Sequence, residues 1–322
     1  MDLDQTFFLA ANSGRGFFSL YADFPGDGAF LHIVKGGPGT GKSGFLRRIR
    51  TAAQERGLGT ETILCSGDPD SLDGLYVPAL GQAWVDGTAP HVREPGVFGA
   101  DSDYVNLGRF CRLPLREEDR QRAAALNRSY KAKYAEAYRL LEAAALLAEA
   151  EERPDPALTA EAIAQADAAL TPFPEAAGNC RRRRRFLSAL TCRGELRLDD
   201  TVNSLCKQIY CLRGDPSALD HAAAEAEKRC AELILCPDPL RPERLEAVLV
   251  PELGVGFLLS PAALPVPEGE RRLSREAAAR AMDRLREAKA LHDKLEAVYR
   301  PYMDFAALDA FTDGYLAKLF GS

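Results

Sequence analysis

A glycine-rich turn followed by a lysine and a serine is the part of this sequence with the clearest capacity for chemistry. The pattern G-x-x-x-x-G-K-S/T is met at four positions, Gly36, Gly41, Lys42 and Ser43. A lysine ammonium supplies a point charge for the β- and γ-phosphates of a nucleotide, and a serine hydroxyl at a helix N-terminus can bind Mg²⁺. The pattern therefore predicts a phosphate-binding loop for a nucleoside triphosphate and Mg²⁺.

The other residues of this loop suit a main chain that wraps around an anion. Glycines accept positive φ angles, so that consecutive backbone N–H groups can point inward at a phosphate, and Pro38 stiffens the turn. The predicted cofactor-binding residues are Gly36, Gly37, Pro38, Gly39, Thr40, Gly41, Lys42, Ser43 and Gly44. The flanking sequence agrees, because FLHIV is typical of a strand and the later segment has Phe45, Leu46 and Ile49 on one helical face.

Such a loop needs a carboxylate at the end of a neighbouring strand to hold Mg²⁺, usually through water. Asp86 is the leading candidate, because it ends the apolar run AWVD directly before a Gly-Thr turn. Asp68 and Asp73 are the alternatives, since they follow the predicted strand TETILC. All three can also be simple turn residues. We predict Ser43 and Asp86 as metal ligands, and Lys42, Asp86 and Asp68 as the residues that act in catalysis.

Two signatures of more specific chemistry are missing from the sequence. No Glu follows Asp86, so the Asp-Glu pair with which many ATPases activate water is absent, and no N/T-K-x-D segment follows the loop, which favours ATP over GTP. His91 either stands near the γ-phosphate or is a loop histidine satisfied by the backbone. The leading hypothesis is an ATP·Mg-binding NTPase in which nucleotide state moves helical arms. A phosphotransferase and a nucleotide-sensing module without turnover are the alternatives.

Composition limits the class of protein. The chain has 322 residues, of which 46% are hydrophobic, and this is enough for two domains. No run of about 18 apolar residues occurs, and the N-terminus is acidic where a signal peptide is basic. The net charge of −6 argues against general nucleic-acid binding, and the eight cysteines contain no C-x-x-C pair. We expect a cytoplasmic protein with reduced cysteines and no membrane partner.

An internal repeat divides the chain. Residues 7–38 align without a gap with residues 185–216, and a second block that starts at Asp68 is also repeated. Identical pairs include Phe8/Phe186, Gly36/Gly214, Pro38/Pro216, Val77/Val250 and Pro78/Pro251. We therefore expect an α/β protein with two tandem units, residues 1–178 and 179–322, that pack around an approximate twofold axis.

The second copy has lost the residues that carry charge or contact phosphate, while its apolar positions are kept. Lys42 is replaced by Asp220, and Ser43 by His221. A carboxylate at the lysine position repels a β-phosphate. We expect one nucleotide to bind, in the first unit, with the second unit as a degenerate scaffold that braces it.

Each unit also carries a predicted helical arm, at about residues 115–170 and 270–320. In the first arm, apolar residues recur at i+3 and i+4 spacing and form one stripe: Leu126, Tyr130, Tyr134, Ala137, Leu141 and Ala145. In the second, Ser274 is the expected N-cap, and Pro301 bends or ends the helix. We expect the arms to pack on the cores or on each other, and a protein partner or a homo-oligomer would bind through them.

A run of five arginines, Arg181 to Arg185, lies at the junction of the two units. Such a run is either a solvated linker or a set of contacts to the nucleotide or to an anionic partner. The sequence leaves both interpretations open.

Four segments of the first unit, KGGPGTGKS, DPDSLDGL, VDGTAPHV and VNLG, are echoed in the second. In this combination the chain resembles a bacterial family of double-P-loop ATPase-type proteins, found mainly in Firmicutes and sometimes labelled nucleotide kinases. The resemblance covers most of the chain and implies two units of P-loop NTPase-like fold and nucleotide binding, without a substrate. In that family the second phosphate loop is usually intact, whereas here Asp220 stands at its lysine position.

Overall fold

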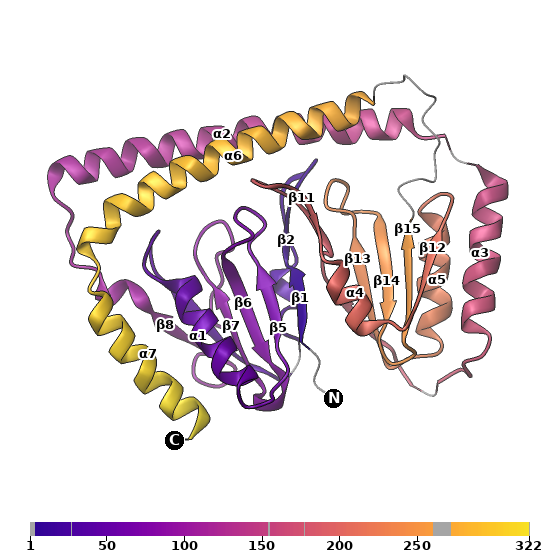
Figure 1. Cartoon of the computed structure of the whole chain (residues 1–322), viewed down its shortest axis with the longest axis horizontal. Helices are drawn as coiled ribbons and strands as arrows, with labels where there is room; N and C mark the ends of the chain where they lie inside the picture. Colours follow the sequence, from indigo (N-terminus) through magenta and orange to yellow (C-terminus); the bar gives the residue numbers. More distant parts are fainter. Residues whose placement is uncertain (1–3, 27, 154, 177, 260–271, 322) are drawn as a thin grey trace.

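Two mixed β-sheets flanked by helices make up the protein, and two long helices lie side by side across both sheets (Figure 1). The structure is a computed structural model that describes residues 4–26, 28–153, 155–176, 178–259 and 272–321. No helix in these ranges is both long and apolar enough to cross a membrane.

The first sheet has six strands. In spatial order they are β1 (Gln5–Phe8), β5 (Glu61–Leu64), β6 (Leu72–Val77), β7 (Gln82–Asp86), β4 (Phe30–Lys35) and β8 (Ser102–Asn106). Strand β4 runs parallel to both of its neighbours, whereas β6 is antiparallel to β5 and β7. The carboxyl ends of β4 and β7 therefore meet at one edge of the sheet, where the predicted site residues follow.

The second sheet repeats this arrangement with five strands. Their order is β12 (Gln208–Leu212), β15 (Val255–Leu259), β14 (Leu245–Val250), β13 (Glu232–Pro237) and β9 (Arg181–Arg184). As with β4 and β7, β12 and β15 are parallel, and β14 is antiparallel to both neighbours. Read from β9 to β12, these five strands have the same order and directions as β1 to β4 in the first sheet, and β8 is an additional strand of the first sheet. The predicted pair of α/β units is thus visible as two related sheets.

A hairpin follows the first strand of each unit. The hairpins are β2 (Ala10–Ser13) with β3 (Gly16–Ser19), and β10 (Ser188–Thr191) with β11 (Gly194–Arg197). A short helix, α4 (Asp199–Leu205), follows the second hairpin. The hairpins lie near the junction of the two sheets (Figure 1).

The two units share one hydrophobic core at this junction. Phe8 donates its backbone N–H to the carbonyl of Phe186 at 3.0 Å, and Phe186 donates to the carbonyl of Phe8 at 2.9 Å. These are equivalent residues of the repeat, and the reciprocal pattern is the one that an approximate twofold axis produces. Phe7, Leu9, Leu187 and Ala189 are buried in the same cluster. Separating the units would expose this apolar surface to water.

The arginine run is neither a solvated linker nor a free cationic patch. Its first four residues form β9 (Arg181–Arg184), and two of its side chains bind the same carboxylate. Arg183 donates to Glu61 Oε2 at 2.7 Å, and the fully buried Arg185 donates to the other oxygen. Burial of Glu61 opposes its ionisation, but Arg185 and Arg183 outweigh this, so the pKa of Glu61 is lowered. Because Glu61 belongs to β5, this buried ion pair joins the two units.

The arms are exchanged between the units. The long helices α2 (Glu117–Glu151) and α6 (Leu273–Tyr299) pair with each other along their length (Figure 1). Beyond α2, α3 (Pro156–Leu170) packs on α5 (Ser217–Glu227) of the second unit. Beyond α6, α7 (Phe305–Phe320) packs on α1 (Lys42–Gln54) of the first unit. The arms therefore pack both on each other and on the cores, as predicted, and each ends on the unit to which it does not belong in sequence.

Helix α7 makes specific contacts with the first unit. Trp84, fully buried in β7, donates its indole N–H to the hydroxyl of Tyr315 in α7 at 2.8 Å, and the rings of Phe45 and Phe311 stack.

Helix α6 ends at Tyr299, before Pro301, as predicted. The prediction that Ser274 caps α6 is wrong, because the helix begins at Leu273 and the Ser274 hydroxyl donates instead to Glu151 at the end of α2.

Candidate functional site

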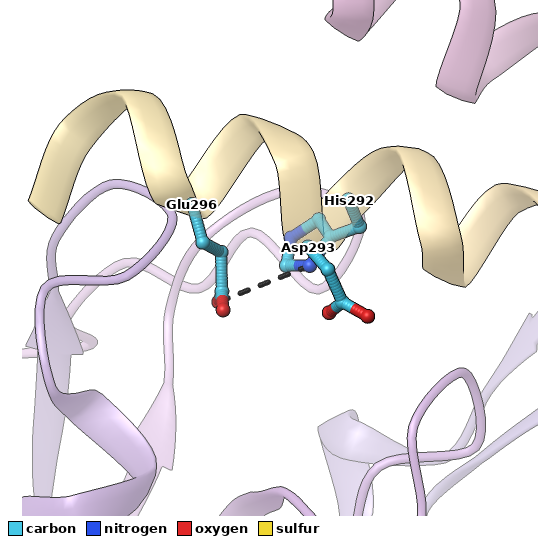
Figure 2. A group of neighbouring side chains, drawn as sticks. All are labelled: His292, Asp293 and Glu296. Carbon is cyan, nitrogen blue, oxygen red and sulfur yellow. Dashed lines mark ion pairs between the residues drawn. The ribbon is translucent and has the colours of Figure 1, made fainter.

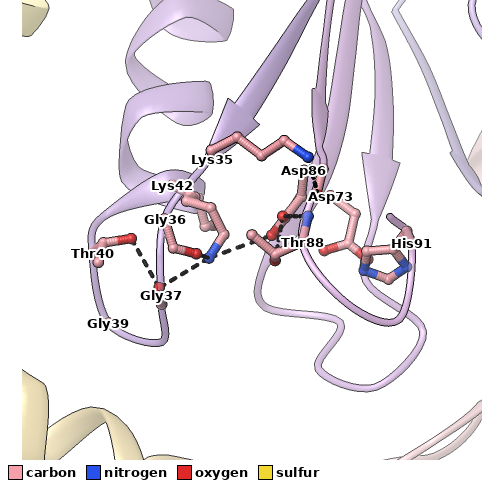
Figure 3. A network of polar contacts seen from close by, with 12 residues as sticks. Lys35, Gly36, Gly37, Gly39, Thr40, Lys42, Asp73, Asp86, Thr88 and His91 are labelled. Atoms are coloured by element: carbon pink, nitrogen blue, oxygen red, sulfur yellow. Dashed lines mark hydrogen bonds and ion pairs between the residues drawn. The ribbon is translucent and has the colours of Figure 1, made fainter. Parts of the chain in front are cut away.

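The glycine loop, residues 36–41, connects β4 to α1 at the carboxyl edge of the first sheet (Figure 3). Gly39 and Gly41 have φ angles of 70° and 85°, which side chains other than hydrogen rarely permit. A Cβ on Gly36 would lie 2.4 Å from Thr40 Oγ1, too close for any real contact. The Thr40 hydroxyl donates to the carbonyl of Gly37 at 2.9 Å and closes the loop. The loop therefore has the compact backbone path that the glycine pattern predicts.

Lys42 lies inside this loop instead of reaching into solvent. Its Nζ donates to the carbonyls of Gly36 and Gly37, each at 3.0 Å, and lies 3.6 Å from Asp86 Oδ2 (Figure 3). The side chains of Lys42 and Asp86 are only 14% and 12% exposed. Two residues that are far apart in the sequence and were predicted to act together are thus brought into contact.

Asp86 is held rigidly at the end of β7. Its position is set by the parallel pairing of β7 with β4, in which Asp86 is the partner of Val34. Its Oδ1 accepts hydrogen bonds from the backbone N–H of Thr88 at 2.8 Å and from the Thr88 hydroxyl at 2.6 Å. The remaining oxygen faces Lys42, so a hard oxygen ligand lies beside the glycine loop.

Ser43 is the second predicted metal ligand and lies in the first turn of α1. Its Oγ accepts the backbone N–H of Leu72 at 2.9 Å, which ties the start of α1 to the start of β6. Lys42, Ser43 and Asp86 therefore surround the same strand ends. A hydroxyl and a carboxylate are the oxygen ligands that suit Mg²⁺.

Asp73, in β6, lies next to Asp86, in the adjacent antiparallel strand β7. Strands β6 and β7 pair Gly74 with Val85, so the next residues outward are Asp73 and Asp86. Asp73 was predicted only as an alternative to Asp86, because the pairing of β6 with β7 cannot be read from local spacing. Burial raises the pKa of Asp73 above its ordinary value, with His91 opposing this and Asp86 adding to it.

Asp68 is placed differently from the other predicted residues. It accepts the hydroxyl of Ser71 at 2.9 Å within its own turn, and it lies 3.4 Å from Lys289 Nζ of α6. Its described partners are therefore the turn and the arm of the second unit, whereas Asp86 pairs with Lys42.

Helix α6 contacts the glycine loop, and Figure 2 shows three polar side chains of this part of the helix, His292, Asp293 and Glu296. Glu296 Oε1 accepts the backbone N–H of Gly39 at 3.2 Å, and His292 Nδ1 lies 3.8 Å from the same oxygen. Burial lowers the pKa of His292. Asp293 completes a group of three potential metal ligands, but the Lys289 ammonium already pairs with it. These α6 residues were missed, since nothing in their helical spacing indicates that they reach a loop more than 250 residues away.

The equivalent loop of the second unit has a different form. Helix α5 begins at Ser217, directly after Pro216, so no extended loop separates it from β12. Helix α3 lies against the remaining turn, because a Cβ on Gly214 would be 2.9 Å from Thr159 Cα and the N–H of Asp215 is donated to Thr159 Oγ1 at 3.3 Å. A neighbouring cavity of about 690 Å³ is lined by both arginines and carboxylates.

Comparison with known proteins finds no match. No family model matches the chain, and neither a curated protein nor a solved structure is significantly similar to it. The family resemblance noted from the sequence therefore stays a prediction.

Proposed function

We propose that the chain is an ATP·Mg-binding P-loop NTPase with one intact nucleotide site, in the first unit, and that nucleotide binding moves helix α6. The observation that carries the proposal is the contact beside the glycine loop between Lys42, at the start of α1, and Asp86, at the end of β7, with Ser43 as the next residue of α1. Lys42 and Ser43 are neighbours in the sequence motif, whereas Asp86 lies near Lys42 because β7 pairs with β4.

The residues present fit both parts of the ligand. A Cβ on Gly36 would meet Thr40, and Gly39 and Gly41 have positive φ angles, so the loop has a compact backbone path that suits phosphate oxygens. The N-terminus of α1 adds partial positive charge. Ser43 and Asp86 would hold Mg²⁺, Asp86 through water. Bound Mg²⁺ would neutralise negative charge that develops on the phosphates. Lys42 would contribute its ammonium to the same task.

Glu296 links this site to the arm of the second unit. Its carboxylate accepts the Gly39 N–H, a donor that a nucleotide phosphate would also use. Two anions compete for such a donor, so binding of ATP favours release of Glu296 from the loop. Helix α6 is continuous from Leu273 to Tyr299 and packs along α2, so a shift at its Glu296 end is carried towards the second unit.

The second unit serves as a brace in this proposal. Its loop is shortened, Asp220 stands in place of the lysine, and α3 lies against the turn. Its contribution to the first unit is the shared core around Phe8 and Phe186 and the helix α7 that covers α1.

Calorimetric titration with ATP, with and without Mg²⁺, tests the proposal. We expect a stoichiometry near one and a weakening of well over tenfold in Lys42→Ala, because loss of a charge-assisted contact costs about 1.5 to 3 kcal/mol. Lys131→Ala, which removes an exposed lysine of α2, is the matched control. Unchanged affinity in Lys42→Ala, or two bound nucleotides, would contradict the proposal.

Phosphate release then separates the possible reactions. We expect ATP alone to yield free phosphate. If phosphate leaves ATP only in the presence of a pool of nucleosides and metabolites, and appears on one of them, the protein is a phosphotransferase. Binding without either outcome would identify a nucleotide sensor.

A further inference from the structure

We propose that Asp73, positioned by Tyr21 and His91, is the general base that takes the proton from the water that attacks the γ-phosphate of ATP. The inference rests on the proposed nucleotide site. It supplies the carboxylate that the sequence lacks after Asp86.

Asp73 lies close to the proposed nucleotide site. Asp86 lies 3.6 Å from Lys42, and Asp73 is its neighbour on the next strand at the same edge of the sheet. In Figure 3, Asp73 and Asp86 lie on the same side of the glycine loop. A carboxylate one strand beyond the metal ligand is well placed for a water molecule at the outer phosphate, because a general base must come within hydrogen-bond reach of the proton it removes.

Asp73 is buried and held in place by its neighbours. Its side chain is 7% exposed, and one oxygen, Oδ2, accepts the Tyr21 hydroxyl at 3.2 Å and lies 3.4 Å from His91 Nε2. The His91 ring in turn packs between the rings of Phe17 and Tyr21, with centroids 5.4 and 4.8 Å away. The carboxylate is therefore held by Tyr21, His91 and the Cys65 thiol, without help from lysine or arginine in the described contacts.

In the second unit, the position equivalent to Asp73 has a structural use. Glu246 is the equivalent of Asp73, and it accepts the N–H of Ser188 at 3.0 Å and the Ser188 hydroxyl at 2.6 Å. It thereby ties β14 to the hairpin strand β10. No backbone donor to Asp73 is found in the described part of the chain, and the titratable groups that interact with it include Tyr21, Cys65, Asp86, His91 and Tyr130. The carboxylate at this position therefore has different contacts in the unit that keeps the intact glycine loop.

The chemistry balances without a further reactant. The proton of the attacking water passes to a carboxylate oxygen of Asp73 as the water oxygen forms a bond to the γ-phosphorus. The bond from that phosphorus to the β–γ bridging oxygen breaks, and ADP leaves with the electron pair. The proton then leaves Asp73 to phosphate or solvent.

The test compares turnover with binding in full-length variants. Asp73→Asn keeps the shape of the side chain, and we expect the kcat of ATP hydrolysis to fall by about 100-fold or more while the Kd for ATP·Mg stays within about threefold. The matched control is Asp70→Asn, an exposed carboxylate in the preceding turn that pairs with Arg193, and it should leave kcat unchanged. Turnover is expressed per molecule able to bind a fluorescent ATP analogue, so a fraction of unfolded protein does not affect the comparison.

Two further variants test the positioning residues. Tyr21→Phe removes only the hydroxyl, and His91→Asn removes the ring; both should lower kcat with little change in the KM for ATP, whereas a loss of structure would change both and lower the Tm. Asp73→Asn with a kcat within threefold of the natural chain would overturn the inference, and so would a natural chain that binds ATP·Mg but releases no phosphate. Failure to bind ATP·Mg at all would instead refute the proposed function.

Discussion

Glu296→Ala is expected to tighten ATP binding about fivefold, because the natural carboxylate must leave the Gly39 N–H before a phosphate can take it. The hydrogen bond is 3.2 Å long and has a charged acceptor, but the Glu296 side chain is 43% exposed, so solvent screens it. A net contribution of about 1 kcal/mol is reasonable for such a contact, and this corresponds to about a fivefold change in Kd. Removing a negative charge near the incoming triphosphate acts in the same direction.

Calorimetry with ATP·Mg at low and high salt measures this effect. The matched control is Glu287→Ala, which removes the same charge from α6 at a site that pairs with Lys133 and Arg284 instead of the loop. The gain for Glu296→Ala should shrink as salt screens the charge, and Glu287→Ala should have little effect. Equal affinities for the natural chain and Glu296→Ala, or a weaker variant, would refute the competition between Glu296 and phosphate.

Three other changes test different parts of the structure. Asp86→Asn should keep some nucleotide binding but lose its Mg²⁺ dependence and any turnover; if Asp68→Asn has this effect in its place, Asp68 is the metal ligand. Glu61→Gln leaves Arg185 buried without its carboxylate and should lower the free energy of unfolding by about 3 to 5 kcal/mol in urea titrations. Because the fold lowers the pKa of Glu61, this difference is fully present above the ordinary value of 4.5 and declines as the pH falls through the folded-state pKa; a pH-independent difference would contradict the ion pair. A chain that ends at residue 178 lacks α7 and half of the shared core, and should aggregate in gel filtration or melt early; a stable monomer with full ATP affinity would show that no brace is needed.

Several features follow from the sequence because local spacing determines them. The glycine loop lies where the pattern places it, since its glycines and the strand and helix around it are specified within a short stretch of chain. The arms follow from the stripe that includes Ala137 and Leu141, both buried in α2. The repeat of strands follows from aligned apolar positions, which keep the same faces buried in both sheets.

Only the tertiary structure decided which of these elements meet. Asp73 lies beside Asp86 through the antiparallel pairing of β6, and the arginine run pairs with Glu61 across the junction of the two units. Glu296 reaches the glycine loop because α6 crosses from the second unit to the first. The physical reason is that strand order and helix docking depend on burying apolar surface between segments far apart in the chain, so neither can be read from the spacing of residues within one segment.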